Sequence, residues 1–154
     1  MKKVQNMIDI NLAPEKQKIR IDGDDNRIIE LDTTDITVLK RLQEVYPRLN
    51  ELGMKGFEID DSSDEITPEA LEALTSALNT VDKEMRDIID YIFDSKIADI
   101  CVQNGAMYNM RNGEFVFERI LDALFTLYAE DIQKEFGKMS DRMKQHTAKY
   151  TGKK

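Results

Sequence analysis

Only a few side chains in this sequence could carry out chemistry of their own. It has one cysteine, Cys101, and one histidine, His146. A transition-metal site needs several His, Cys or carboxylate ligands close together, and nucleophilic catalysis needs a thiol or hydroxyl held beside a base. His146 lies in a segment with few apolar residues, where a preorganised site is hard to build. We therefore expect no metal, no cofactor and no catalytic nucleophile, and we interpret Cys101 as a small core residue.

Two groups of acidic residues also deserve a chemical interpretation. One cluster consists of Asp60, Asp61, Asp64 and Glu65. It lacks the alternating Asp/Asn positions, the glycine and the closing glutamate of a calcium loop, so a solvated loop is favoured. Asp90 and Asp94, one helical turn apart, could hold a divalent metal or share a proton, but two solvent-facing helix residues are the simpler interpretation. The sequence therefore predicts a protein that is not an enzyme.

Charge is unevenly distributed along the chain. The 154 residues carry a net charge of −8, and the last 17 contain six Lys or Arg and one Asp, so these are +5 and the preceding 137 are −13. An acidic body argues against nucleic-acid binding and favours a protein partner. A single cysteine excludes an intrachain disulfide, and no apolar run is long enough for a signal peptide or a membrane span. We expect one cytoplasmic domain that binds no membrane.

Residues 17–32 predict a β-hairpin. Their sequence, QKIRIDGDDNRIIELD, places turn-forming residues 23–26 between two β-branched runs. Because a two-stranded hairpin is marginal alone, its apolar residues must pack on a helix or pair with another subunit. We take this edge as a candidate oligomer contact, formed by Ile19, Ile21, Ile28 and Leu31.

Three amphipathic helices follow the hairpin. The first is capped near Thr33-Thr34-Asp35 and continues to Leu52, and Pro47 within it allows either a kinked helix or two helices. Residues 53–66 favour a loop, and Thr67-Pro68-Glu69 starts the second helix. That helix has a heptad stripe, Leu71, Leu74, Leu78, Val81, Met85, Ile88 and Ile92, which widens with Ile89, Phe93, Ile97 and Ile100. Its second half should be buried in a globular core.

The third helix is the expected core helix. Residues 104–113 contain two Asn-Gly pairs and predict a loop with two tight turns. The helix should resume near Glu114 and end around Phe136-Gly137, where the glycine would cap it. The fold class is mainly α with a short N-terminal β-hairpin (α+β), a small helical bundle. We divide the chain into an arm at 1–16, the hairpin and bundle at 17–136, and a basic extension at 137–154 that is helical or orders on a partner.

Two apolar groups are candidate partner-binding residues. Leu71, Leu74 and Leu78 form the start of a stripe that requires a helical partner. Met107, Tyr108 and Met110 lie in the expected loop, where flexible methionines could form an adaptable surface.

The segment Asp87–Phe136, including the phrase IIDYIFD at Ile88–Asp94, resembles the small tail assembly chaperones of long-tailed, siphovirus-type bacteriophages and of prophages of Gram-positive bacteria. The resemblance implies a mainly helical, non-catalytic protein in the cytoplasm of a bacterial host cell. It also implies that the chain coats the tape measure protein before the tail tube polymerises and is absent from the finished virion. Self-association into oligomers would accompany this role, and covering the apolar faces of a long helical client would prevent its aggregation.

Two other functions compete with this expectation. The acidic body could mimic a nucleic-acid surface and inhibit a host protein as a decoy, which predicts salt-sensitive binding. Alternatively, the protein could be a structural tail or connector component that remains in the phage particle. Presence in purified particles would distinguish that role from a chaperone.

Overall fold

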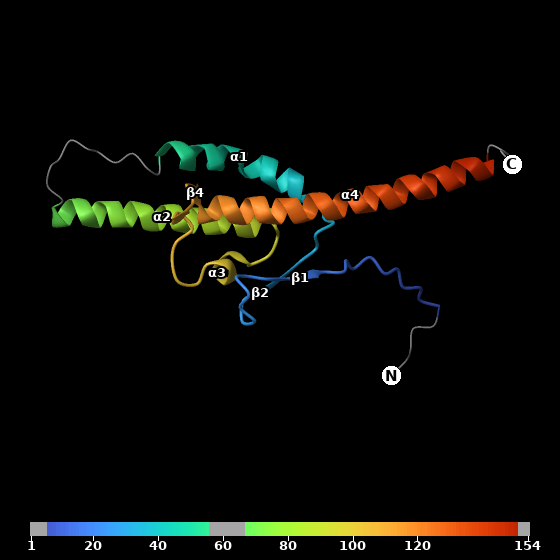
Figure 1. The fold of residues 1–154 in the computed structure, drawn as a ribbon, viewed down its shortest axis with the longest axis horizontal. Helices are drawn as coiled ribbons and strands as arrows, with labels where there is room; N and C mark the ends of the chain where they lie inside the picture. Colours follow the sequence, from blue (N-terminus) through green and yellow to red (C-terminus); the bar gives the residue numbers. More distant parts are fainter. Residues whose placement is uncertain (1–5, 56–66, 151–154) are drawn as a thin grey trace.

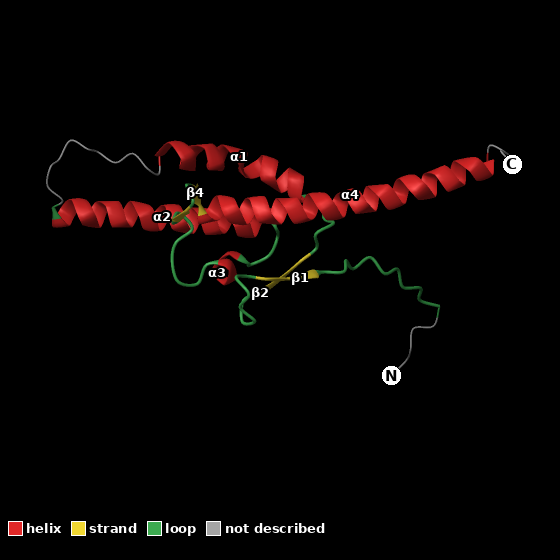
Figure 2. Cartoon of the chain, in the orientation of Figure 1, coloured by secondary structure: helices red, strands yellow, loops and turns green. Residues whose placement is uncertain are grey.

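The computed structural model describes residues 6–55 and 67–150, and it shows a mainly helical fold with a short N-terminal hairpin (Figures 1 and 2). Strands β1 (Gln17–Arg20) and β2 (Ile28–Leu31) pair antiparallel, with Ile19 opposite Ile29. This confirms the predicted hairpin. Its alternation buries Ile29 and Leu31 and leaves Ile28 exposed on the other face.

Helix α1 (Val38–Lys55) is one helix that contains Pro47, which resolves the choice between one helix and two. It begins later than the predicted cap, because Asp35 instead closes a turn by accepting hydrogen bonds from the amide and hydroxyl of Thr37. The helix also continues into the segment predicted as a loop from residue 53. The acidic cluster of residues 60–65 lies outside the described residues.

Helix α2 (Pro68–Ile92) begins as the sequence predicts. The Thr67 hydroxyl accepts a hydrogen bond from the Ala70 amide at 3.1 Å, and Pro68 occupies the first turn. The expected continuation of this stripe through Ile97 and Ile100 is wrong. The helix ends at Ile92, Asp94 adopts a left-handed conformation (φ 49°), and a separate short helix α3 (Ala98–Cys101) follows.

The loop predicted over residues 104–113 contains more regular structure than expected. Strands β3 (Met110–Arg111) and β4 (Glu114–Phe115) form a second small hairpin around Asn112-Gly113. Both turn residues have positive φ, the geometry that an Asn-Gly pair favours in a two-residue hairpin.

Helix α4 (Val116–Tyr150) is longer than predicted, because it does not end at Gly137. Residues 137–150 of the basic extension therefore continue one helix, and Figure 1 shows its end projecting alone beyond the other elements. Residues 151–154 lie outside the described residues. A single glycine costs a helix interior about 1 kcal/mol, which good helix formers on both sides can offset.

Gly137→Ala is expected to stabilise this helical segment by roughly 0.5–1 kcal/mol and so to increase its helicity. A Cβ at this position would meet no atom within 4 Å, so the substitution brings no clash. Circular dichroism and thermal denaturation would measure the effect. A lower stability of the variant would contradict this expectation and would show that the helix needs the conformational freedom of glycine at residue 137.

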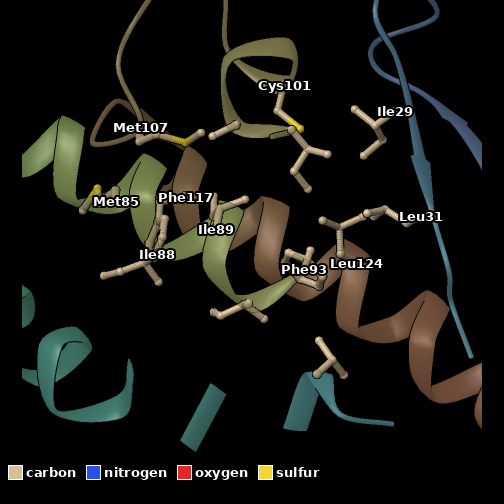
Figure 3. Packing of buried hydrophobic residues seen from close by; sticks show 14 of the residues in the cluster. Ile29, Leu31, Met85, Ile88, Ile89, Phe93, Cys101, Met107, Phe117 and Leu124 are labelled. Carbon is tan, nitrogen blue, oxygen red and sulfur yellow. The ribbon is translucent and has the colours of Figure 1, made fainter. Parts of the chain in front are cut away.

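The core lies where α2, α3, α4 and the hairpin meet (Figure 3). Ile88, Ile89 and Ile92 on α2 are fully buried, and the ring of Phe93 lies 5.5 Å from Phe125 and 5.4 Å from Tyr128 on α4. Helix α1 runs antiparallel to α2, since Arg41 reaches the Ile92 carbonyl at 2.7 Å and Arg48 reaches Glu84 at 2.6 Å. The expected burial of the second half of the heptad stripe is confirmed.

Candidate interaction surfaces

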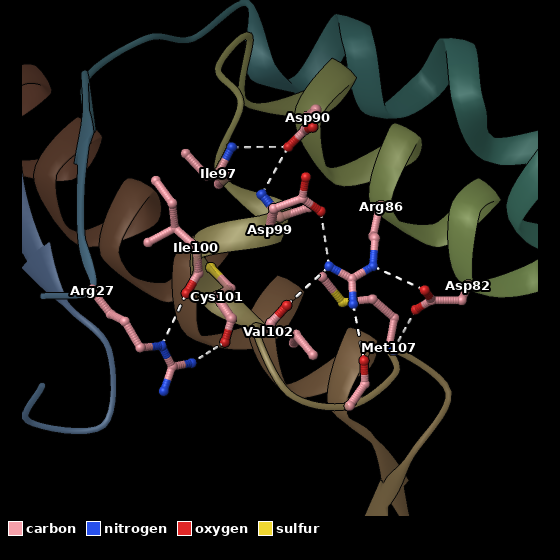
Figure 4. Close-up of polar contacts among 12 residues, drawn as sticks. Arg27, Asp82, Arg86, Asp90, Ile97, Asp99, Ile100, Cys101, Val102 and Met107 are labelled. Atoms are coloured by element: carbon pink, nitrogen blue, oxygen red, sulfur yellow. Dashed lines mark hydrogen bonds and ion pairs between the residues drawn. The ribbon is translucent and has the colours of Figure 1, made fainter. Parts of the chain in front are cut away.

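A network of arginines and aspartates holds the segment from α3 to β3 against α2 (Figure 4). Arg86 on α2 forms ion pairs with Asp82 at 3.0 Å and Asp99 at 2.8 Å, and donates to the carbonyls of Val102 and Gly105. The other oxygen of Asp82 accepts from the Met107 amide at 2.7 Å. Arg86 therefore satisfies several backbone groups that the irregular segment would leave unpaired.

Asp90 and Arg27 close the two ends of α3. Asp90 accepts from the amides of Ile97 and Ala98 at 2.9 and 2.8 Å, and Arg27 donates to the carbonyls of Ile100 and Cys101. Negative charge at a helix start and positive charge at its end are both favourable. The sequence suggests that Asp90 either shares a metal or proton site with Asp94 or faces solvent. In the structure it does neither, because its carboxylate binds the amides at the start of α3.

The ionisable groups of this region are structural in character. Burial opposes ionisation of Asp35, but hydrogen bonds from Thr37 and Arg41 outweigh it and lower the pKa of this carboxyl below its usual value. Burial raises the pKa of Tyr128 to about 12. Among the described residues, no group of three or more His, Cys, Asp or Glu is placed to hold a metal ion.

Cys101 is buried in the core, and its environment makes the thiol a poor nucleophile. Desolvation raises the pKa of Cys101 to about 11, although Arg27 partly opposes this. At neutral pH roughly one thiol in ten thousand is then ionised. The residue belongs to the core cluster, as the sequence predicts for a small core residue.

The native protein is therefore expected to react with maleimide reagents at neutral pH far more slowly than the same protein in urea, because only unfolding exposes and ionises Cys101. A time course of labelling followed by mass spectrometry measures both rates. Equal rates in the two conditions would mean that α3 opens freely in the native state.

The strongest candidate interaction surface is the N-terminal half of α2. Leu71 is 52% exposed and Leu74 is 45% exposed, whereas Leu78 is half-buried where the cover by α1 begins. Figure 1 shows this end of α2 at the opposite end of the molecule from the projecting end of α4. We call Leu71, Leu74 and Leu78 the α2 leucine face. These are the three leucines that the sequence predicts as partner-binding residues, and Leu71 and Leu74 are exposed because the heptad stripe extends beyond the core.

No protein-family model, no curated protein and no solved structure matches this chain. Within the described residues, no helix is both long enough and apolar enough to cross a membrane. The assignment of function therefore depends on the geometry of the exposed surfaces.

The predicted binding loop is divided by the fold, and the prediction for Met107 is wrong. Met107 is fully buried in the core, where its amide is held by Asp82, so it cannot contact a partner in this conformation. Tyr108 is half-buried and Met110, on β3, is exposed. Of the three predicted residues, only Met110 is exposed. The spacing of the two methionines in the sequence does not show which side chain points inward.

The predicted oligomer edge is also divided. Leu31 is buried and belongs to the core, so the prediction that it forms an intersubunit contact is wrong. Ile19 and Ile21 are half-buried and line an open groove of about 650 Å³, whose other walls are α4 and the residues that follow α3. Ile28 is exposed on the outer face of the hairpin. The four residues therefore do not share one surface.

Within the described part of the chain, two further exposed apolar surfaces were not predicted from the sequence. The first lies on the C-terminal part of α4 and consists of Phe136, Met139 and Met143. Its signal is the 3–4 spacing that crosses Gly137, where the sequence predicts a helix end. The second is the extended arm before β1, where Met7, Ile8, Ile10 and Leu12 are all exposed. The alternation of Ile8, Ile10 and Leu12 was its signal.

Proposed function

We propose that this protein is a non-catalytic assembly chaperone of the phage tail type, which binds the tape measure protein and keeps it soluble before the tail tube polymerises. The observation that carries the proposal is the α2 leucine face. Exposed leucines at helical spacing are suited to an apolar helix of a client, because two apolar stripes bury each other when helices pack side by side.

The fold supports this role in a second way. The leucine face is the continuation of a stripe whose other half forms the core, so it is presented on a helix whose C-terminal half is buried and is bonded to α1 through Arg41 and Arg48. A surface on a preformed helix loses less conformational freedom on binding than a disordered segment would. The acidic body would add charge to the complex and increase its solubility.

The experiment is co-expression with the tape measure protein, followed by size-exclusion chromatography with light scattering. The wild-type chain is expected to give a soluble complex with several copies per client that survives high salt, since apolar burial is screened little. Leu71→Glu with Leu74→Glu should return the client to the insoluble fraction. The matched control, Ala73→Glu with Ser76→Glu, adds the same charge to exposed positions on the opposite face of the helix and should keep it soluble.

An acidic decoy is the second candidate function, favoured by the net charge of −13 on the first 137 residues. It predicts that binding to a basic host protein falls steeply as salt rises and that the two pairs of glutamate substitutions have the same small effect. A client that stays insoluble beside the wild-type chain would contradict the chaperone proposal, and salt-sensitive capture of a nucleic-acid-binding protein would support the decoy.

A further inference from the structure

The projecting end of α4 carries an apolar face of its own, which we call the α4 face. Phe136, Met139 and Met143 are 49%, 41% and 58% exposed. They continue the stripe that buries Leu124 and Tyr128 nearer the start of the helix. Phe136 and Met139 line an open groove together with Thr34 and Ile36 of the body, and Figure 1 shows the end of the helix projecting alone beyond the other elements.

The spacing along this face is a heptad pattern. Ile132, Phe136, Met139, Met143 and His146 are separated by 4, 3, 4 and 3 residues. Such a seam pairs with a second helix through successive layers of knobs and holes. If an identical helix ran in the opposite direction, Met139 would meet Met143 of a second copy, and Phe136 would meet His146 of that copy.

Charges beside the seam distinguish the possible partners and directions. One flank carries Glu135, Arg142 and Lys149, each seven residues from the next, and the other flank carries uncharged Gln133, Ser140 and Thr147. In an antiparallel pair the charged flank of one helix lies along the charged flank of the other, in the opposite direction. Glu135 of each copy then lies opposite Lys149 of the other, which gives two attractive contacts, and the two Arg142 side chains lie opposite each other, which gives one repulsive contact. A parallel pair would set the charged flank against the uncharged one and gain no ion pair.

We propose that the α4 face is a self-association site, at which two copies of this chain pair antiparallel through Phe136, Met139 and Met143 with Glu135–Lys149 contacts across the seam. Two attractive contacts outweigh one repulsive contact in this arrangement. The association is isologous, because each copy contributes the same surface, and it therefore closes as a two-fold dimer. The inference does not depend on the proposed function, and the α2 leucine face at the other end of each molecule stays free.

Sedimentation equilibrium of the full chain over a wide range of concentrations tests the pairing. The wild-type protein is expected to be a reversible dimer. Met139→Glu places a charge in each of the two central Met139–Met143 layers and should weaken dimerisation at least a hundredfold. Gln145→Glu adds the same charge to the exposed opposite face of the helix and should leave the dimer intact. Both positions are exposed, so neither change affects folding of the core.

Charge reversal tests the antiparallel register itself. Glu135→Lys or Lys149→Glu alone converts two attractive contacts into repulsive ones and should weaken the dimer about tenfold. The double variant should recover the affinity of the wild type, and Arg142→Gln should tighten the dimer by removing the central repulsion. Glu135 also pairs with Lys138 at 3.2 Å within the helix, so circular dichroism checks that helicity is unchanged.

Three results would overturn the proposal. The first is a wild-type chain that stays monomeric at every concentration. The second is a double charge reversal that remains as weak as its single variants. The third is a Met139→Glu variant that dimerises normally but no longer solubilises the tape measure protein, which would make the α4 face a client site. Substitutions in the α2 leucine face should abolish client binding and leave the dimer unaffected. The experiments can therefore contradict either proposal without contradicting the other.

Discussion

Ile88→Ala is expected to lower the free energy of unfolding by about 3 kcal/mol, whereas Leu71→Ala should change it by no more than about 0.5 kcal/mol. Both residues belong to the same heptad stripe on α2, and both substitutions remove a large aliphatic side chain. Ile88 is fully buried in the core, so its loss leaves a cavity, while Leu71 is more than half exposed and loses few contacts. The contrast separates the core half of the stripe from its surface half.

Urea denaturation followed by circular dichroism measures both changes, and equal slopes of the unfolding transition would show that the compared states are the same. A loss of 2 kcal/mol or more for Leu71→Ala would contradict the account. That result would mean that Leu71 packs in the protein and is not available to a client.

Arg86→Ala should destabilise the protein by roughly 3 kcal/mol, the second large effect. The substitution leaves Asp82 and the carbonyls of Val102 and Gly105 without their shared donor. The side chain of Arg86 is only 18% exposed, so water replaces the lost hydrogen bonds poorly. Hydrogen exchange should consequently rise most in residues 97–107, which the arginine holds against α2.

Arg86→Lys keeps the charge but cannot form the forked contacts, so it should recover only part of the lost stability. Arg119→Ala, at an exposed position of α4, is the matched control and should have little effect. Uniformly faster exchange throughout the chain for Arg86→Ala, with no preference for residues 97–107, would contradict the local role of this arginine.

The sequence predicts correctly those elements whose formation depends on residues close together in the chain. The hairpin with its turn-forming residues 23–26 and the cap at Thr67 are both predicted from residue types, because each depends on a few neighbouring residues; in the structure the connection spans residues 21–27. The end of α2 depends on Asp90 binding the amides of Ile97 and Ala98, a contact that forms only after the chain has turned back. No glycine or proline marks that turn, and the left-handed residue is Asp94.

The interaction surfaces show the same limit. Periodicity identified the α2 leucine face, but it could not show that the cover by α1 starts only near Leu78. The prediction for Met107 is wrong, since loop residues are usually exposed, whereas its amide is bonded to Asp82 on α2, a contact between residues far apart in the sequence. The α4 face could not be predicted for a different reason: glycine is typical of helix ends, so the apolar spacing across Gly137 does not by itself show that one helix continues through it.

Site-specific thiol labelling of the complex tests the central claim, that the α2 leucine face binds the client, most directly. The native Cys101 is buried with a pKa of about 11, so a cysteine introduced at an exposed position is labelled selectively. The account predicts that Leu71→Cys labels rapidly in the free protein and is strongly protected by the tape measure protein. Ser76→Cys, on the opposite face of the same helix, should label at the same rate with and without the client. Equal labelling of both positions in the complex would contradict the account.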